Sequence, residues 1–240
     1  MSEIKGKNKH IKGETMSEII TGTVAKKADQ IAMQEMGFKS LDLMETASSK
    51  VAIYVNRHYT YARESRILVL AGVGNNGADA VAVARMLKET GYDPVVWVVG
   101  KPEKASWEFL YQMFNYQQLL GRAMIYREGD SLPDSDILID GIFGIGLHRP
   151  VSGVYKSFMD EVNAHSHGVT IAIDAPSGID TDSGELMGTG IKATITITFG
   201  RNKTGLVTGT GKDYSGKIFV EDIGIPDEAY ERAKQTWKIT

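Results

Sequence analysis

Short runs of consecutive apolar residues recur along this chain, and they constrain its fold more than any other feature. Each is shorter than the ~10–12 residues of an ordinary helix, and several end in glycine or aspartate. A run that is apolar at every position is typical of a strand covered on both faces, as in a parallel sheet. The segments that we interpret as strands are residues 66–72, 94–99, 123–126, 136–142, 169–174, 193–199 and 217–220.

Between these segments, apolar residues return at every third or fourth position, which is the period of an amphipathic helix. This spacing predicts helices over residues 76–90, 103–120 and 155–164. It also predicts two helices over residues 25–55, because Gly37 interrupts the pattern there. Alternating strands and helices predict an α/β fold, a mostly parallel sheet with helices on both faces.

The domain organisation follows from what lies between these elements. No linker rich in proline, glycine and serine divides the chain, and no internal repeat is visible. We therefore expect a disordered tail over residues 1–15 and a single domain over residues 16–240. Only a glycine-rich connection joins the runs at 193–199 and 217–220. We expect this last pair of strands to be antiparallel, at an edge of the sheet.

The composition excludes several classes of function. The chain has 27 Lys and Arg against 30 Asp and Glu, a formal net charge of −3, which gives no electrostatic reason to expect nucleic acid or a membrane surface as its main partner. It has no cysteine, which excludes disulfides, thiolate zinc sites and cysteine nucleophiles and fits the reducing cytoplasm. No apolar segment has the length of a membrane span.

The first residues do not resemble a signal peptide. Lys5, Lys7, Lys9 and Lys12 lie in residues 1–13, but no apolar segment follows them. We interpret these residues as a solvated tail, with a basic tail that touches a partner as the alternative.

The first of the expected strands is followed by a glycine-rich segment, at the edge where open α/β sheets bind ligands. Residues 71–79 read Ala-Gly-Val-Gly-Asn-Asn-Gly-Ala-Asp. Glycines let the backbone approach a ligand closely, and the N–H groups of the next helix face an anion. The segment is neither a Rossmann G-x-G-x-x-G nor a Walker A motif. A plain strand-to-helix turn capped by asparagine explains it equally well.

Carboxylates and a lysine follow the later strands. Asp140 precedes the segment Gly-Ile-Phe-Gly-Ile-Gly. This segment is either a loop that closes over a phosphate or sugar, or a plain turn that Asp140 caps and the glycines permit. Asp174 ends an apolar strand, where a carboxylate must be hydrogen-bonded, paired or functional and could serve as a general acid or base. Ser177 lacks the surroundings of a nucleophile elbow, and no histidine spacing suggests a triad or a metal site. Lys203 either neutralises a phosphate or shuttles a proton, or is a solvated loop lysine.

Taken in order, these segments resemble the NAD(P)H-hydrate epimerase family, the YjeF N-terminal domain. The motifs are Gly-x-Gly-Asn-Asn-Gly-x-Asp from Gly72, Asp-x-x-Phe-Gly-x-Gly from Asp140, Asp-x-Pro-Ser-Gly from Asp174 and Thr-Phe-Gly-x-x-Lys-x-Gly from Thr198. The resemblance covers about residues 24–228. It implies a three-layer α/β/α Rossmann-like sandwich with a mostly parallel central sheet. It also implies an isomerase that interconverts the R and S forms of hydrated NADH and NADPH, damaged cofactors with a hydroxyl on C6 of the nicotinamide ring.

The resemblance further implies a set of site residues. Asp174 would contact the reacting end of the hydrated dinucleotide and act as general base, with Lys203 as a candidate proton donor. A potassium ion would be bound by Asn76, Asp140 and Ser177, whose oxygen atoms suit a hard cation. On this basis Asp174→Asn should lower the rate by about 10²–10⁴-fold, keep dinucleotide binding and leave the melting temperature almost unchanged. The rest of the dinucleotide would be held by Asn75, Asn76, Gly77, Ala78, Asp79, Gly144, Ile145, Gly146, Leu147, His148, Arg149 and Pro150.

Two segments depart from the family pattern. Ala78 and Ala80 replace two glycines of Asn-Asn-Gly-Gly-Asp-Gly, and Thr46 and Ser48 replace the Asn and Gly of Leu-Met-Glu-Asn-Ala-Gly. A methyl group at position 78 would narrow the pocket if the backbone there had positive φ or touched phosphate. These departures keep a second hypothesis open, a catalytically inactive nucleotide-binding or scaffold protein of the same fold.

Two further expectations concern substrates and partners. A different enzyme that acts on a phosphorylated or ribosylated small molecule in the same cleft is a third hypothesis. Dimers are common in the family, and the apolar and aromatic positions of residues 54–61 predict the association surface of a homodimer.

Overall fold

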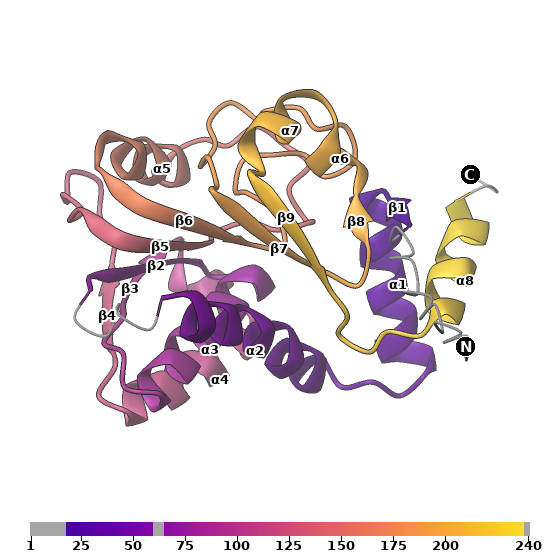
Figure 1. The fold of residues 1–240 in the computed structure, drawn as a ribbon, viewed down its shortest axis with the longest axis horizontal. Coiled ribbons are helices and arrows are strands. Elements are labelled where there is room, and N and C mark those ends of the chain that lie inside the picture. Colours follow the sequence, from indigo (N-terminus) through magenta and orange to yellow (C-terminus); the bar gives the residue numbers. More distant parts are fainter. Residues whose placement is uncertain (1–17, 60–64, 238–240) are drawn as a thin grey trace, which may run out of the picture.

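The computed structural model describes residues 18–59 and 65–237. Within these residues a parallel sheet of seven strands lies between two layers of helices, in the strand order β4-β3-β2-β5-β6-β7-β9 (Figure 1). This is the α/β sandwich that the alternating pattern predicts. The predicted tail, residues 1–15, lies outside the described residues. The strands are β2 (Ile67–Gly72), β3 (Val95–Val99), β4 (Arg122–Ile125), β5 (Ser135–Gly141), β6 (His167–Ile173), β7 (Ile195–Phe199) and β9 (Lys217–Glu221).

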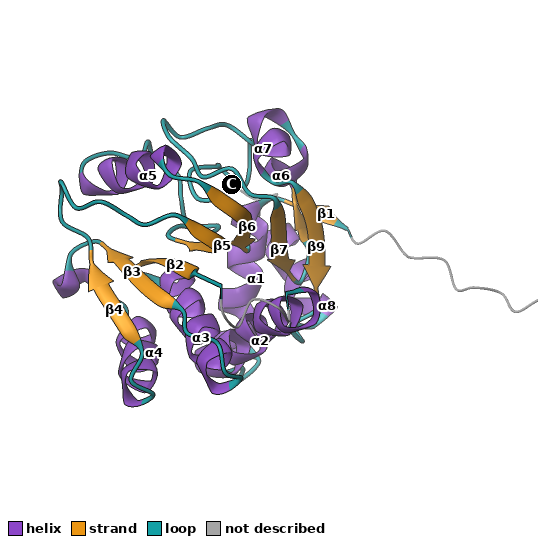
Figure 2. Ribbon diagram, turned by 60° about the vertical axis from the view of Figure 1, so that its left-hand side comes forward, coloured by secondary structure: helices purple, strands orange, loops and turns teal. Residues whose placement is uncertain are grey.

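Two hydrophobic clusters cover the two faces of the sheet. On one face α2 (Ser40–His58), α3 (Asn75–Glu89) and α4 (Trp107–Gln118) pack on alternate strand residues such as Val69 and Ile139. On the other face α5 (Val154–Ala164) packs on Leu68, Leu70 and neighbouring residues. Figures 1 and 2 show these layers on opposite sides of the strands. Both clusters use strands that are apolar at consecutive positions, as a sheet buried on both faces requires.

The last strand of the sheet corrects one expectation. β9 does lie at the edge, but it pairs with β7 in parallel, with Ile195 opposite Lys217 and Phe199 opposite Glu221. The prediction of an antiparallel pair was wrong because the connection between them is not a simple loop. It contains β8 (Asn202–Lys203), α6 (Thr204–Val207) and α7 (Gly209–Tyr214). These short elements carry the chain from the carboxyl end of β7 back to the edge of the sheet where the strands begin, so β9 runs in the same direction as β7.

Of a helix pair at one end of the molecule, the first helix was expected from the sequence and the second was not. α1 (Gly22–Glu35) and α8 (Asp227–Trp237) pack on each other in a third hydrophobic cluster, which includes Ala28, Ile31 and Tyr230. Both lie at the same end of the sheet in Figure 1. Before α1, the short strand β1 (Ile19–Ile20) pairs in parallel with β8. In the described part of the chain, no helix is long and apolar enough to cross a membrane.

The direction of the strand order changes between β2 and β5. After β2 the chain continues outward to β3 and β4, and after β4 it returns to β5 on the other side of β2. In open α/β sheets this switch point is where ligands bind, beyond the carboxyl ends of the strands. Gly72 and Gly141 are the last residues of the two strands that flank it.

Candidate active site

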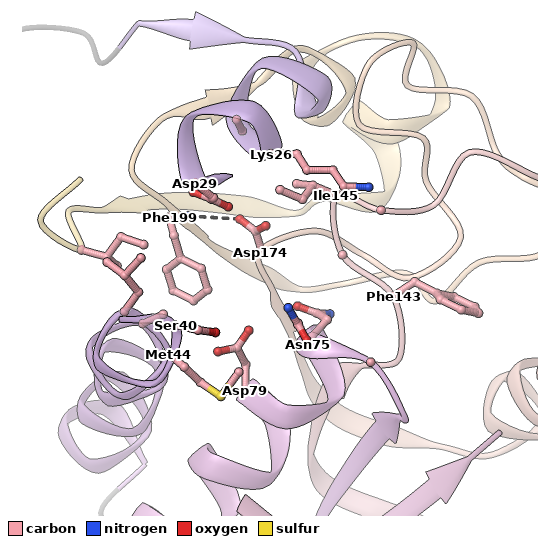
Figure 3. A pocket seen from close by; sticks show the side chains of 18 of the residues that line it. Lys26, Asp29, Ser40, Met44, Asn75, Asp79, Phe143, Ile145, Asp174 and Phe199 are labelled. Carbon is pink, nitrogen blue, oxygen red and sulfur yellow. Dashed lines mark hydrogen bonds between the residues drawn. The ribbon is translucent and has the colours of Figure 1, made fainter. Parts of the chain in front are cut away.

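A cavity of about 490 Å³ opens at this switch point (Figure 3). Its walls come from α1, the start of α2, the start of α3, the loop after β5, the turn after β6 and the region around β8. The volume is in the range of small-molecule and cofactor sites. The residues that line it include Lys26, Asp29, Ser40, Met44, Asn75, Asn76, Asp79, Phe143, Gly144, Ile145, Gly146, Leu147, Asp174, Phe199, Lys203 and Tyr230.

Asp174 and Lys203, which the sequence singled out separately, form a buried ion pair in this cavity. Lys203 Nζ lies 2.5 Å from Asp174 Oδ1 and also donates to Thr198 Oγ1 and to the carbonyl oxygen of Phe199. An ammonium group has three N–H donors, so all of them have acceptors within the protein. Only 2% of the Lys203 surface is exposed. A cation buried to this degree is stable only when it is paired and hydrogen-bonded in this way.

The backbone at Asp174 is strained. Its φ is 63°, the left-handed region that aspartate enters more readily than most residues but still at a cost. The N–H of Ala175 donates to the carbonyl of Ile173 at 2.8 Å, so Asp174 is the centre of a three-residue turn of the rare, positive-φ kind. The Asp174 N–H is held by the carbonyl of Ile197. Strain of this type is concentrated at functional sites, where contacts with the surrounding structure hold the residue in the strained conformation.

Two further carboxyl groups face the same cavity. Asp29 projects from α1 and Asp79 from the first turns of α3, both toward the space beside Asp174 (Figure 3). Burial, followed by the negative charge of Asp174, raises the pKa of Asp29 to about 7. The same causes raise the pKa of Asp79 well above its ordinary value, although a hydrogen bond from Ser48 opposes them. Asp174 itself receives N–H and O–H donors on one oxygen, from Lys203, Thr198 and Phe199.

The first turn of α3 supplies backbone N–H groups to the cavity. Asn75 and Asn76 line it, whereas Gly77 and Ala78 lie beneath it, fully or almost fully buried. Gly77 must be glycine because a Cβ there would lie 1.7 Å from the carbonyl oxygen of Gly72. This close approach seats the amino end of α3 on the end of β2. The first turn of a helix carries free N–H groups and positive potential, which suit an anion.

The loop after β5 divides into two parts. Gly144, Ile145, Gly146 and Leu147 line the cavity. The next residues, His148, Arg149 and Pro150, are exposed and are not part of the cavity wall, and His148 Nδ1 lies 3.6 Å from Asp180 Oδ2.

Of the three residues predicted to bind potassium, Asn76 lines the cavity, and Asp140 and Ser177 lie behind its wall. Asp140 and Ser177 are completely buried, and both the N–H and the Oγ of Ser177 donate to the Asp140 carboxylate, at 2.8 and 2.6 Å. Asn76 adjoins them, because its side chain and backbone pack against Gly144 and Gly141. Burial raises the pKa of Asp140 to about 6.

The departures from the family pattern fall mainly in the core. Ala78 and Ala80 are completely buried in the cluster beneath α3, and Ala78 lies within the regular helix, so its methyl group does not narrow the cavity. Thr46 donates to the carbonyl of Asp42, in a bond within α2. Ser48 is buried, and its hydroxyl lies 3.2 Å from the carbonyl oxygen and 3.4 Å from Oδ1 of Asp79.

Several cavity residues were missed by the sequence reasoning, above all Asp29. A signal was present: Ala25, Asp29 and Met33 follow one another at intervals of four on one face of α1, and all of them line the cavity. An acidic residue on an otherwise apolar helix face is such a signal. Tyr230 had no comparable signal, because α8 was not expected. Within the predicted association surface, Tyr54 packs partly buried on the core, and residues 60–61 lie outside the described residues, so this surface stays a prediction.

A parallel, doubly wound sheet, with a cavity at its switch point that the first turn of a helix lines, defines a Rossmann-like domain. The chain belongs to the family of the YjeF-related protein N-terminus, whose family model matches residues 40–205.

Similar proteins extend this comparison over nearly the whole chain. The chain is 41% identical to an NAD(P)H-hydrate epimerase of Limosilactobacillus fermentum, over 85% of this chain and 96% of that protein. It is 33% identical to a bifunctional NAD(P)H-hydrate repair enzyme Nnr of Moorella thermoacetica, over 88% of this chain but 41% of that longer protein. The crystal structure of yeast ynu0, YNL200c, is similar in fold, with a TM-score of 0.75 at 22% identity, covering 90% of this chain and 93% of that one.

Proposed function

We propose that this chain is an NAD(P)H-hydrate epimerase, an isomerase that interconverts the R and S forms of hydrated NADH and NADPH. The observation that carries this conclusion is a buried Asp174–Lys203 pair at the wall of the cavity, in a chain that matches almost the full length of a named epimerase. Residues 16–240 would act as one domain, and the reaction would take place in the cytoplasm.

The reaction inverts C6 of the nicotinamide ring, so the bond between C6 and its hydroxyl must break and form again. This requires a group that takes a proton from the oxygen that attacks. Asp174 is suited to that role because three donors hold one of its oxygens and fix the position of the carboxylate. Within the described residues, Oδ2 receives no hydrogen bond and is free to accept one from the substrate.

Lys203 is better suited to hold Asp174 than to give a proton. All three of its N–H groups already have acceptors, so a transfer to substrate would break the ion pair. We therefore assign it as a positioning residue, in place of the proton donor that the family resemblance implied.

The dinucleotide would lie along the edge of the sheet. Its pyrophosphate would sit near Asn75 and Asn76 at the amino end of α3 and near Gly144 and Gly146 of the facing loop, because these segments line the cavity with backbone N–H groups and small residues. The nicotinamide end would then reach Asp174, with Asp79 between the two regions.

A potassium ion beside Asp140 is consistent with the charges there. Asp140 is completely buried, its pKa of about 6 leaves it ionised at neutral pH, and only hydrogen bonds offset the burial. No cationic side chain lies among the described groups that act on it. The amide of Asn76 has a buried Nδ2 without a partner. Exchanging the amide nitrogen and oxygen would turn an oxygen to that position. Asn76, Asp140 and Ser177 would therefore hold the ion, which would offset negative charge beside the substrate phosphates.

A homodimer is also supported by an exposed apolar stripe on α4, which we call the α4 face. Trp107, Leu110, Tyr111 and Phe114 recur at helical spacing and are between 46% and 60% exposed. The edge strand β4 lies beside α4 in Figures 1 and 2 and exposes Ile125. An apolar face next to an unpaired strand edge is typical of an association surface. We propose that a second copy of this chain covers it.

The test of this function is a direct assay of epimerisation. The R form of hydrated NADH or NADPH would be incubated with purified protein, and the two forms separated by chromatography, with the spontaneous rate subtracted. We expect conversion above that rate, increased when potassium replaces an inert cation. A wild-type rate equal to the spontaneous one, with dinucleotide binding intact, would instead support the scaffold hypothesis.

A further inference from the structure

Asp29 is a carboxyl group that faces the reacting end of the cavity without a hydrogen-bond partner in the described residues. It lies on α1, and Figure 3 shows its side chain directed toward that of Asp174. Two sets of contacts hold α1 in this position. Its amino end is bound to Asp182 through Thr23, and its opposite face packs on α8.

Asp29 and Asp174 have opposite surroundings. Asp174 is held by an ammonium group, a hydroxyl and a backbone N–H, all of which stabilise a carboxylate. Asp29 has none of these, and its environment favours the protonated form, with a pKa of about 7. Two neighbouring carboxyl groups in such different environments are the usual arrangement of a paired acid and base.

We propose that Asp29 is the proton donor of this active site, acting with Asp174 as the base. This rests on the epimerase function proposed above. Asp29 gives its proton to the C6 hydroxyl, the C6–O electron pair leaves with the oxygen as water, and the lone pair of N1 forms the C6=N1 double bond. Water then adds to the other face of C6, the C6=N1 pair returns to N1, and Asp174 takes the released proton. Transfer of that proton to Asp29 through water restores both groups, so no proton is gained or lost overall.

The other acids near the cavity are less suitable. At Asp79, burial and the negative charge of Asp174 raise the pKa well above the ordinary value, so it would stay protonated and serve as a hydrogen-bond donor to the ligand. Tyr230, on α8, is a phenol whose pKa is raised further by burial. A donor works best when its pKa lies close to the operating pH, because it must both give up and regain the proton.

The titratable groups around Asp29 lie on several elements of the cavity wall. Lys26 lies on the same helix at the cavity rim, Asp174 and Lys203 lie across from it, Asp79 lies on α3 and Tyr230 on α8. Asp174 raises and Lys203 lowers the pKa of Asp29. Removal of the Asp174 charge should therefore lower the pKa of Asp29.

The first experiment is a pH–rate profile of the wild type, Asp29→Asn and Asp29→Glu. The donor must be protonated, so the wild-type rate should fall as pH rises through about 7. Asp29→Asn should lower kcat by about 10²–10⁴-fold, keep the dissociation constant of the dinucleotide and lose this alkaline decline, whereas Asp29→Glu should restore part of the rate. Asp42→Asn, the same change at an exposed position of α2, is the matched control and should leave rate and profile unchanged.

A second experiment does not depend on turnover. Carbon NMR of protein labelled at aspartate, with the Asp29 signal identified by its loss in Asp29→Asn, should show titration near neutral pH, shifted lower in Asp174→Asn. Titration of Asp29 near pH 4 would overturn the proposal, as would a full rate in Asp29→Asn or an alkaline decline that disappears in Asp79→Asn instead. A wild-type rate no greater than the spontaneous one overturns the epimerase function, and the assignment of Asp29 as its donor with it.

Discussion

Lys203 Nζ and Asp174 Oδ1 lie 2.5 Å apart in a pair that is almost completely buried. The pair joins the strained turn after β6 to β8, so it fixes the position of the proposed base and also connects two parts of the fold. Because the lysine has no exposed route to water and uses all its donors within the protein, the charge of Asp174 is needed for stability as well as for chemistry.

The first prediction concerns Asp174→Asn. Asparagine accepts the same positive φ, so the turn should remain, and the epimerase rate should fall by about 10²–10⁴-fold. We no longer expect an unchanged melting temperature, because in this variant the buried Lys203 loses its counter-charge. A loss of about 3–5 kcal/mol in the free energy of unfolding is expected, measured by urea denaturation.

A double variant separates these two effects. Lys203→Met in the Asp174→Asn background removes the unpaired charge and should recover part of the lost stability, while the rate stays low. Recovery of activity in this double variant would show that Asp174 acts only through folding.

The second prediction concerns potassium. A cation that binds only the folded protein stabilises it by about 1.4 kcal/mol at ten times its dissociation constant, or roughly 3–5 °C in Tm for a chain of this size. We expect this rise in potassium chloride relative to choline chloride at equal ionic strength, and none in Asp140→Asn. Equal Tm values for the wild type in the two salts would argue against the site.

The third prediction is the pH dependence of stability from Asp29. Its pKa is about 7 in the folded protein against 3.8 for the free side chain, so between these values the folded state binds the proton and the unfolded state does not. Stability from this group therefore falls as pH rises from about 4 to 7 and is constant above. Relative to wild type, Asp29→Asn should become more stable by about 2–3 kcal/mol between pH 5 and pH 8. Parallel curves of unfolding free energy against pH would contradict this.

A fourth prediction compares two glycines of the strand-to-helix segment. A Cβ at position 77 would lie 1.7 Å from the carbonyl oxygen of Gly72, whereas a Cβ at position 74 meets nothing within 4 Å. Gly77→Ala should therefore lower the melting temperature strongly, despite the better helix propensity of alanine. Gly74→Ala is the control and should change it little. Similar melting temperatures for the two variants would mean that the close contact relaxes freely.

The fifth prediction concerns the homodimer. Phe114 is 60% exposed on the α4 face, and Phe114→Glu would place a charge in the proposed interface. We expect the wild type to sediment as a dimer and Phe114→Glu as a monomer. Ile53→Glu, an exposed apolar position on α2, should stay dimeric. A monomeric Ile53→Glu with a dimeric Phe114→Glu would move the interface to the surface expected near residues 54–61.

Much of the fold could be predicted because the spacing of apolar residues along the chain indicates where strands and helices lie. The strand ending at Gly72 has apolar residues at consecutive positions, and the helix over residues 75–89 has them at every third or fourth position. This change made both elements predictable. The segments around Asp140, Asp174 and Lys203 could be found for a related reason. A parallel sheet brings the carboxyl ends of its strands to one edge, so polar residues that end apolar strands are expected to meet there.

The sequence alone determined which residues are candidates for chemistry, because polar groups stand out against apolar strands. Only the tertiary structure decided how they are paired. The direction of β9 depended on short elements with no periodic signal, and the position of Asp29 depended on the packing of α1 against α8. These contacts join segments far apart in the chain, and their energy comes from burial and charge that no local pattern records. Asp174 is therefore half of a buried ion pair, and Asp29 an acid that titrates near neutral pH, only in the folded cavity.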